Sequence, residues 1–223
     1  MISALITAAG ISTRCQKNKM LELIKGKPLI IRTLERFLAC EEIDEIIVTA
    51  READMGRFEE LTRELDIVSV VMGGEQRVES MLNAINASCG DILITHDGAR
   101  PLVKPALIKS LISCVKDSGA AMTAINPTAT VKISSNQTMK ITGTLPRIKT
   151  WIAQTPQGYN RGIIKPAMEK AVKEKYFVPT DDSEIVANIT SQDIMIVPGD
   201  YSNIKVTHQS DIEIANALFE ECC

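Results

Sequence analysis

Long apolar runs are missing from this sequence of 223 residues. A membrane-spanning helix needs about 20 consecutive apolar residues, and no stretch of the chain approaches that length. No basic region precedes the first apolar stretch, so we expect a core strand there rather than a signal peptide. Cations are not in excess either, because the formal net charge is −3. We therefore expect neither a membrane nor a nucleic acid as a partner.

Metal-ligand spacing is also missing. The chain has two histidines, and their different sequence contexts argue against a histidine-based zinc site. Its six cysteines are scattered without metal-ligand spacing: Cys15, Cys40, Cys89, Cys114, Cys222 and Cys223. Free thiols in a reducing compartment are the simplest explanation, and we expect a cytoplasmic protein.

Two common phosphate-binding motifs are absent from the first apolar run and the loop after it. The dinucleotide fingerprint needs three spaced glycines, and only Gly10 is present, which argues against a nicotinamide oxidoreductase. The P-loop needs a terminal Gly-Lys-Ser/Thr, which this loop lacks. The loop does contain small residues followed by two cations, Arg14 and Lys19.

Small residues after a buried strand can bring backbone N–H groups close to a ligand. The apolar run of residues 4–7 is short enough for a buried parallel strand, and it leads into the small residues 8–10. Arg14 and Lys19 would supply the positive charge that a polyphosphate needs. A tight strand-to-helix turn with two solvated cations is an equally good interpretation of these residues alone.

Short Val/Ile-rich runs alternate with helical periodicity almost to the end of the chain. The predicted strands are residues 4–7, 46–49, 67–71, 92–95, 121–125 and 194–197. Between them, apolar residues recur at helical spacing: Met55, Phe58, Leu61 and Leu65; Val78, Met81, Leu82 and Ile85; Leu107, Ile108, Leu111, Ile112 and Val115. This alternation predicts one α/β domain over residues 1–223, with a mostly parallel sheet and helices on both faces. Ligands of such sheets bind beyond the carboxyl ends of the strands.

Residues 126–145 interrupt this pattern. The segment is rich in Thr, Ser and Asn, and residues 130–133 and 139–142 could pair as a hairpin. Such a hairpin has too little apolar surface to be stable in isolation. It is therefore either a surface excursion, which composition alone favours, or an arm that docks on another subunit.

Two polar motifs follow predicted strands. Residues 73–80 would place backbone N–H groups at a helix start, where they suit an anion or the edge of a base; a plain Gly-Gly turn is the alternative. Residues 95–101 place Asp97 and Arg100 on a loop. That pair suits a metal–phosphate site, and a surface ion pair is the alternative.

Two further motifs lie near the end of the chain. Within residues 180–184, Asp181 and Glu184 are spaced like a capping box, so a helix cap is the favoured interpretation. Residues 203–207 precede a terminal helix, and Lys205 on its own would be an exposed charge.

Taken in order, these segments resemble the 2-C-methyl-D-erythritol 4-phosphate cytidylyltransferase family of the non-mevalonate isoprenoid pathway. Six motifs are in register over nearly the whole chain: Ala-Ala-Gly…Arg…Lys, Gly-Gly…Arg…Ser, His-Asp-x-Ala-Arg-Pro, Thr-Pro-Gln, Thr-Asp-Asp and Asn-Ile-Lys-Val-Thr. Each motif alone is weak, but six in order are specific. Ribitol-5-phosphate cytidylyltransferases share most of them and are the main alternative.

The resemblance implies a Rossmann-like nucleotidyltransferase fold and a role for each matching residue. The CTP site would be lined by Ala8, Ala9, Gly10, Arg14, Lys19, Gly74 and Ser80. The polyol phosphate would face Asp97, Arg100 and Lys205, and Asp97 would also be a ligand of Mg²⁺. Exchange of the arm within a homodimer would add Thr130, Arg147 and Thr155 from the neighbouring subunit, which favours docking for residues 126–145. The catalytic cations would be Arg14, Lys19, Lys205 and Arg147.

Four positions depart from the family's usual pattern. The family usually has a second Gly at Ser12, a Met at Cys15 and a Pro at Asn18. An Asp is usual at Ala129, and the loop from Arg14 to Lys19 is shorter than is common. These departures bear on loop geometry and acceptor preference, but both cations of the loop remain.

The implied reaction transfers CMP from CTP to a polyol phosphate and releases pyrophosphate. Because the attacking phosphate is already an anion, catalysis needs positioning and cations near the α-phosphate rather than a covalent intermediate. Lys19, Arg14 and Mg²⁺ would have that role. A nucleotide-binding regulatory protein that has lost turnover is the alternative from another class, and the retained cations argue against it.

Overall fold

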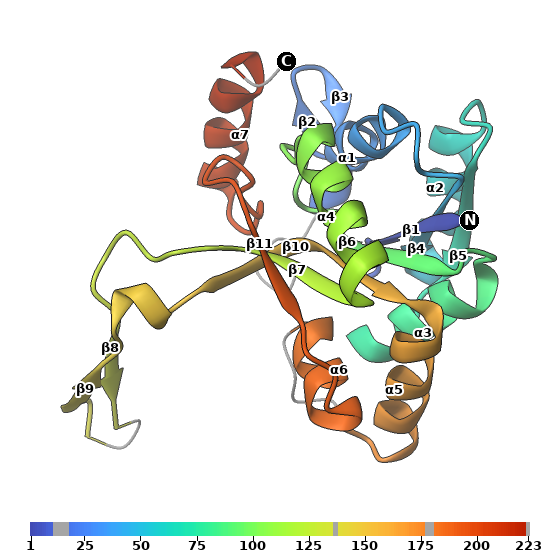
Figure 1. Cartoon of the computed structure of the whole chain (residues 1–223). Helices are drawn as coiled ribbons and strands as arrows, with labels where there is room; N and C mark the ends of the chain where they lie inside the picture. The colour runs from blue at the N-terminus through green and yellow to red at the C-terminus, as the bar shows by residue number, and fades with distance from the viewer. Residues whose placement is uncertain (11–17, 136–137, 177–180, 222–223) are drawn as a thin grey trace.

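The structure is a computed structural model that describes residues 1–10, 18–135, 138–176 and 181–221. At its centre lies a seven-stranded sheet with the strand order β11-β7-β10-β6-β1-β4-β5 (Figure 1). Every neighbouring pair in it is parallel except the two that include β10. The mostly parallel sheet predicted from the sequence is therefore confirmed.

The six strands predicted from apolar runs are all present, with bounds close to those expected. They are β1 (Ile2–Thr7), β4 (Glu45–Ala50), β5 (Val68–Met72), β6 (Ile92–Asp97), β7 (Ala120–Ile125) and β11 (Met195–Pro198). β1 is central because it pairs with β4 on one side and β6 on the other. Leu5, for example, lies opposite Ile47 in one pair and Thr95 in the other.

Alternate side chains of the strands contribute to two separate cores, because successive residues point to opposite faces. On β1, Ala4 and Ile6 lie in one core and Leu5 lies in the other. Helices cover both faces (Figure 1). The first core includes residues of α1 (Leu29–Leu38), α2 (Met55–Thr62), α4 (Pro105–Ser118) and α7 (Gln209–Glu221); the second includes residues of α3 (Arg77–Ala87), α5 (Arg161–Lys173) and α6 (Asp182–Thr190). Only Leu65 among the periodic residues lies beyond its helix, since α2 ends at Thr62.

β10 (Ile152–Asn160) was not predicted as a strand, although it lies in the middle of the sheet. Its sequence is polar and contains Pro156, which is unusual for a central strand. It runs antiparallel to β6 and β7, and its register with β7 shifts between Ala153 and Gln157. Such an irregularity removes the proline from regular ladder pairing. The Thr-Pro-Gln motif therefore lies inside the sheet and not on a loop.

Short elements complete the part of the chain that the structure describes. They are η1 (Lys19–Leu21), the antiparallel pair β2 (Leu23–Ile24) and β3 (Lys27–Pro28), and η2 (Glu52–Asp54). None of the helices among the described residues has the length and apolar character needed to span a membrane.

Residues 126–145, here called the arm, extend away from the sheet (Figure 1). β8 (Lys132–Ser134) and β9 (Ile141–Thr144) pair antiparallel, with Lys132 opposite Thr144, so the predicted hairpin is confirmed. η3 (Arg147–Lys149) leads from the arm back into β10. The arm and η3 expose large apolar side chains: Ile133, Met139, Ile141, Leu145 and Ile148.

Candidate active site

A cleft of about 580 Å³ opens beyond the carboxyl ends of β1, β4, β5 and β6, where the sequence predicts a ligand site. Loops that follow these strands form most of its lining, and Lys205 comes from the segment before α7. The lining residues are Thr7, Ala9, Gly10, Lys19, Met20, Arg51, Glu52, Met72, Gly73, Gly74, Glu75, Gln76, Arg77, Ser80, Asp97, Ala99 and Lys205.

Small residues bring two loops of the cleft into close contact. A Cβ atom placed on Gly73 would lie 2.4 Å from Cβ of Ala9, closer than real Cβ atoms approach one another. Ala9 and Gly10 both line the cleft. Ala8 is buried instead, and its N–H donates to the Thr49 carbonyl over 3.1 Å. Ala8 therefore supports the loop from behind.

The start of α3 forms the opposite wall. The Gly74 N–H donates to Oγ of Ser80 over 3.0 Å, and the Gln76 N–H donates to Glu79 Oε2 over 2.9 Å. Gly74 also leaves space that a side chain would not have, because a Cβ there would lie 2.3 Å from Glu79 Cβ. The predicted pair Gly74 and Ser80 thus lies at the cleft, in a turn that only small residues allow.

Lys19 lines the cleft at the first residue of η1. Asn18 precedes it and accepts a hydrogen bond from the Met20 N–H over 3.0 Å, which caps this short helix. The asparagine that departs from the family's usual proline therefore has a local structural role. Arg14, the other predicted cation of this loop, and the departures at Ser12 and Cys15 lie outside the described residues.

Asp97 is the central acid of the other half of the cleft. Its Oδ2 accepts hydrogen bonds from Lys205 Nζ over 3.0 Å and from Arg100 Nε over 3.2 Å. Burial would raise the pKa of this carboxyl, but the charges of Lys205, Arg100 and Arg77 hold that pKa well below its usual value. Asp97 is therefore ionised and holds two cations near the cleft.

Arg100 forms an ion pair with Asp97, which was the alternative interpretation of residues 95–101, but this pair is largely buried and not on the surface. Its side chain is 11% exposed, as is that of Asp97. A second guanidinium nitrogen of Arg100, Nη1, donates to the Asn203 carbonyl over 2.8 Å. Arg100 joins the loop after β6 to the segment that carries Lys205, and it is not among the described residues that line the cleft.

An ion pair between Arg77 and Asp182 was not predicted. Arg77 lines the cleft and binds Asp182 through both terminal guanidinium nitrogens, Nη1 at 2.5 Å and Nη2 at 3.2 Å, although the two residues are 105 positions apart. Asp182 is fully buried. Burial lowers the pKa of Arg77, but the carboxylates of Asp182 and Asp97 raise it by more, so the net pKa is above its usual value and the guanidinium stays charged. Both residues stand in motifs singled out above; nothing local in the sequence indicates that they meet.

The helix cap expected at residues 180–184 is present on α6. Asp181 Oδ1 accepts from the Glu184 N–H over 3.0 Å. The cap fixes the start of the helix whose first residue, Asp182, reaches the cleft cation Arg77. Thr180 lies outside the described residues.

Thr155 does not lie where the arm-exchange prediction placed it. It is buried on β10, and its Oγ1 accepts from the Asp97 N–H of the same chain over 3.0 Å. The reason is the antiparallel strand that the sequence analysis missed, which runs directly beside β6. Thr155 therefore supports Asp97 in its own chain.

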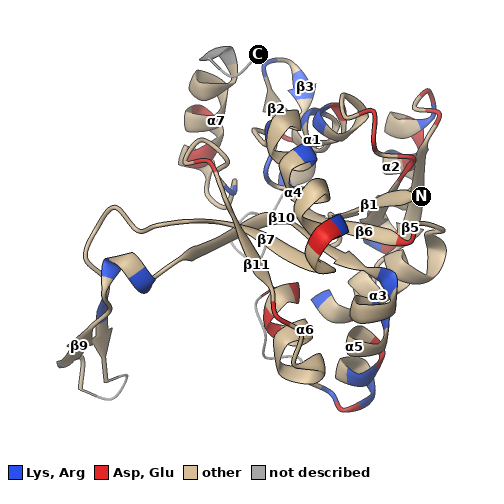
Figure 2. Ribbon diagram, in the orientation of Figure 1, with Lys and Arg blue, Asp and Glu red and all other residues tan. Residues whose placement is uncertain are grey.

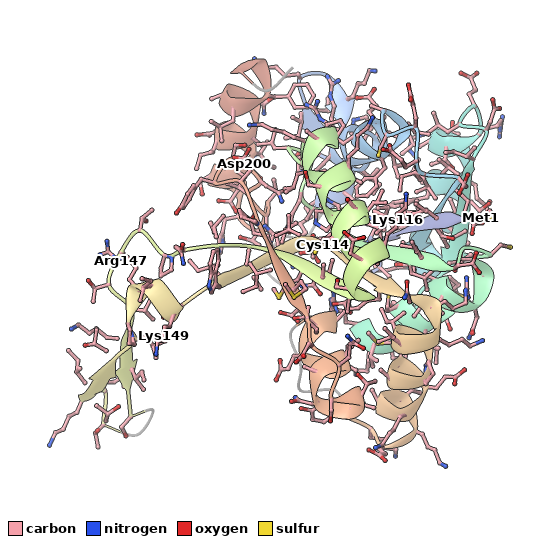
Figure 3. The ribbon with its side chains drawn as sticks, in the orientation of Figure 1. Met1, Cys114, Lys116, Arg147, Lys149 and Asp200 are labelled. Carbon is pink, nitrogen blue, oxygen red and sulfur yellow. The ribbon has the colours of Figure 1, made fainter. Side chains whose placement is uncertain are left out.

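Thr130 and Arg147 lie far from the cleft of their own chain. Both are exposed, one on the arm and the other on η3. Figure 3 shows Arg147 and Lys149 on η3, away from the sheet, and Figure 2 shows the positive charge of this turn. A single chain therefore does not bring these two residues to Lys19 or Asp97.

Comparison with known proteins gives one consistent family. The family model for "2-C-methyl-D-erythritol 4-phosphate cytidylyltransferase" (IspD) matches residues 2–221. A protein of that name from Geotalea uraniireducens is 35% identical over 229 residues, covering 98% of this chain and 97% of the relative. Another from Bacillus pumilus is 34% identical over 221 residues, covering 96% and 95%.

Solved structures agree with this match. The crystal structure of 4-diphosphocytidyl-2C-methyl-D-erythritol synthase from Anaerococcus prevotii superposes with a TM-score of 0.88 at 31% identity, covering 98% of this chain and 96% of that one. The structure of 2-C-methyl-D-erythritol 4-phosphate cytidylyltransferase from Francisella tularensis has a TM-score of 0.82 at 28% identity, covering 97% and 98%. This chain belongs to the 2-C-methyl-D-erythritol 4-phosphate cytidylyltransferase family.

Proposed function

We propose that this chain transfers CMP from CTP to 2-C-methyl-D-erythritol 4-phosphate, giving 4-diphosphocytidyl-2-C-methyl-D-erythritol and pyrophosphate in the non-mevalonate pathway. The observation that carries the proposal is a single cleft, in a chain of this family, that joins the small-residue loop and Lys19 to the cluster of Asp97 and Lys205. The first group suits a nucleoside triphosphate and the second a phosphorylated polyol.

The nucleotide binds on the side of the small residues. Ala9, Gly10, Gly74 and Ser80 hold the cytidine, and Lys19 faces the phosphates. The family resemblance assigns Arg14 to the phosphates as well. Glycines at positions 73 and 74 let the walls of this half of the cleft pack closely, because side chains there would collide with Ala9 and Glu79.

The acceptor binds beside Asp97. Lys205 attracts its phosphate at the cleft, Arg100 adds positive charge through its ion pair with Asp97, and Asp97 accepts from a hydroxyl group. An oxygen of that phosphate attacks the α-phosphorus of CTP in line, and the bond from this phosphorus to the bridging oxygen of the pyrophosphate breaks. The nucleophile is already ionised, so the chain supplies position and positive charge near the α-phosphate.

Mg²⁺ fits this cleft as an ion held mainly by the phosphates of CTP. Magnesium in proteins commonly binds one or two carboxylates plus substrate phosphates and water. Asp97 would offer one carboxylate oxygen, since Oδ2 already accepts from Lys205 and Arg100. The described residues contain no group of three or more side chains that could hold a metal by themselves. When bound, the ion supplies charge neutralisation at the phosphates.

The whole chain acts as one domain, and the arm joins two copies into a homodimer by exchange. The exposed apolar side chains of the arm support this, because a two-stranded hairpin is marginally stable without a further contact. Exchange would bring Thr130 and Arg147 to the acceptor side of the partner's cleft. The free thiols of Cys40, Cys89 and Cys114 suit a reducing cytoplasm.

The test is release of pyrophosphate from CTP and Mg²⁺ with each candidate acceptor in turn. We expect turnover with 2-C-methyl-D-erythritol 4-phosphate, which the Lys19→Ala variant should largely lose. Turnover with ribitol 5-phosphate alone would contradict the proposed acceptor. Binding of CTP without turnover on either acceptor would contradict the enzymatic proposal in favour of a regulatory protein.

A further inference from the structure

His96 is buried directly before Asp97, at the carboxyl end of β6. Its ring lies against Phe37 of α1, with 4.9 Å between the ring centroids. It does not line the cleft, and the sequence analysis gave it no role. Because buried polar atoms are usually hydrogen-bonded, we expect both ring nitrogens of this buried imidazole to have partners.

Both nitrogens have partners, and these partners determine the tautomer. Nε2 lies 3.2 Å from the Arg100 carbonyl oxygen, which can only accept, so Nε2 carries the hydrogen. Oγ1 of Thr155 accepts from the Asp97 N–H and keeps its own hydrogen to donate, and Nδ1 of His96 lies 3.0 Å from it. Nδ1 is then an acceptor, and the Thr155 hydroxyl donates to it over 3.0 Å.

The hydrogen bonds continue to Asp97. The oxygen of Thr155, having donated its hydrogen to His96, accepts from the Asp97 N–H over 3.0 Å. One continuous path therefore runs from the Asp97 N–H through Thr155 and His96 to the Arg100 carbonyl. Each group on the path has a single possible direction of donation.

We propose that His96 is a positioning residue for the acceptor half of the site, where its neutral Nε2–H tautomer holds the turn from Asp97 to Arg100 against β10. The inference rests on the proposed function, because it is the acceptor that Asp97 would contact. His96 bonds the last residue of the turn directly and the first residue through Thr155. It therefore links the backbone at both ends of the turn whose side chains form the Asp97–Arg100 ion pair.

Other contacts hold the middle of the same turn. Substitution of His96 should therefore displace the turn and not unfold it. Thr33 Oγ1 donates to the Gly98 carbonyl over 2.8 Å, and the Gly98 N–H donates to the Thr7 carbonyl over 2.9 Å. The Val206 N–H donates to the Ala99 carbonyl over 2.8 Å. The two ends of the turn are joined by the Arg100 N–H, which donates to the Asp97 carbonyl over 3.0 Å, and His96 ties both ends to β10 through Thr155.

Four variants separate the two hydrogen bonds of the ring. His96→Gln can keep a donor toward the Arg100 carbonyl, and His96→Asn can keep an acceptor for Thr155. Thr155→Val removes the hydroxyl that joins His96 to Asp97, and Thr155→Ser retains it. Ile108→Ala is the matched control, because Ile108 is fully buried on α4 and belongs to neither the cleft nor the turn.

The first measurement compares the two Michaelis constants with thermal stability. For Thr155→Val we expect the KM for the polyol phosphate to rise about tenfold, which corresponds to about 1.4 kcal/mol, because Asp97 loses one of the hydrogen bonds that position it. The KM for CTP should change less than twofold, and Thr155→Ser should restore both values. Ile108→Ala should lower Tm without changing either KM. An unchanged acceptor KM in both Thr155→Val and His96→Gln, or an equal rise in Ile108→Ala, would overturn the proposal.

The second measurement does not depend on turnover. The chain has only two histidines, so ¹⁵N imidazole spectra of wild type and His208→Gln assign His96 directly. We expect His96 to show a protonated Nε2 and a bare Nδ1 between pH 6 and 8. Thr155→Val should shift the Nδ1 signal. A doubly protonated ring or the opposite tautomer would overturn the proposal, even if the enzyme were inactive on every acceptor tested.

Discussion

Charged side chains in the cleft have partners in the same chain, whereas the large apolar side chains of the arm point into solvent. Asp97 holds Lys205 and Arg100, and Arg77 holds Asp182. Met139 on the arm is 81% exposed, and Ile148 on η3, which follows the arm, is 86% exposed. Both regions are polar in sequence, yet their surroundings differ completely.

The difference teaches which parts of the site one chain can assemble. Paired charges keep the cleft side chains in place before any ligand arrives, which is the preorganisation that electrostatic catalysis needs. Exposed apolar side chains gathered on one segment are typical of surfaces that associate with another protein. We therefore expect changes in the cleft to act on the chemistry of the same chain, and changes around the arm to act on the partner's site.

The sharpest test on the cleft side is Lys19→Ala. Losing one preorganised charge near a developing anion typically lowers kcat about a hundred- to a thousandfold. Steady-state pyrophosphate release measures the effect, with circular dichroism to confirm folding. A variant with nearly normal kcat would remove Lys19 from the mechanism.

Exchange of the arm between two chains is tested by mixing two inactive homodimers, Lys19→Ala and Arg147→Ala. If each site combines Lys19 of one chain with Arg147 of the other, a mixed dimer has one intact site and one doubly altered site. Refolding equal amounts together should give about half mixed dimers, and activity should return to about a quarter of wild type. Native mass spectrometry confirms the mixed species. No recovery in their presence would contradict arm exchange.

A smaller effect is expected from Gly73→Ala. The new Cβ would lie 2.4 Å from Cβ of Ala9, so the two loops of the nucleotide half must separate. Overpacking of this kind costs about 1–3 kcal/mol, so we expect the KM for CTP to rise about tenfold or more. Gly162→Ala on α5 is the control, since a Cβ there meets nothing within 4 Å. Equal effects of the two substitutions would contradict the role given to Gly73.

The last prediction concerns acid stability. The pKa of His96 is about 3 in the fold, and about 6.5 is expected for an unfolded chain, so the unfolded state binds the extra proton. The contribution of neutral His96 to the free energy of unfolding is fully present above pH 6.5 and declines as the pH falls toward 3. Burial is the main cause of the low pKa; the hydrogen bond to the Arg100 carbonyl and the charge of Asp97 raise the pKa, and the charges of Arg100 and Lys205 lower it.

Urea unfolding at several pH values measures the decline. Between pH 6 and 5, stability should fall by up to about 1.4 kcal/mol per pH unit, the slope of one proton. His96→Gln should flatten this slope. A slope that persists in His96→Gln would assign the titration to another group.

Local pattern was sufficient for much of this protein. Apolar runs predicted the six strands, and helical periodicity predicted α3 and α4, because side-chain spacing reflects burial on each element. The order of the motifs predicted the family, and their positions after strands predicted the cleft. Asp97, Lys205, Gly74 and Ser80 all lie at or in it.

Contacts between distant segments required the tertiary structure. β10 has no apolar alternation, so only the neighbouring strands β6 and β7 reveal it as part of the sheet. Its place beside β6 brings Thr155 to Asp97 across 58 residues of sequence.

The sequence by itself determined the strands, the small-residue loop and the charges available at the strand ends. Which charges meet was decided by the packing of α6 and β10 against the rest of the fold. Arg77 reaches Asp182, and His96 joins Thr155 to Arg100, through bonds that no periodicity encodes. The physical reason is that periodicity reports which face of an element is buried, whereas a hydrogen bond or ion pair depends on which element packs against that face.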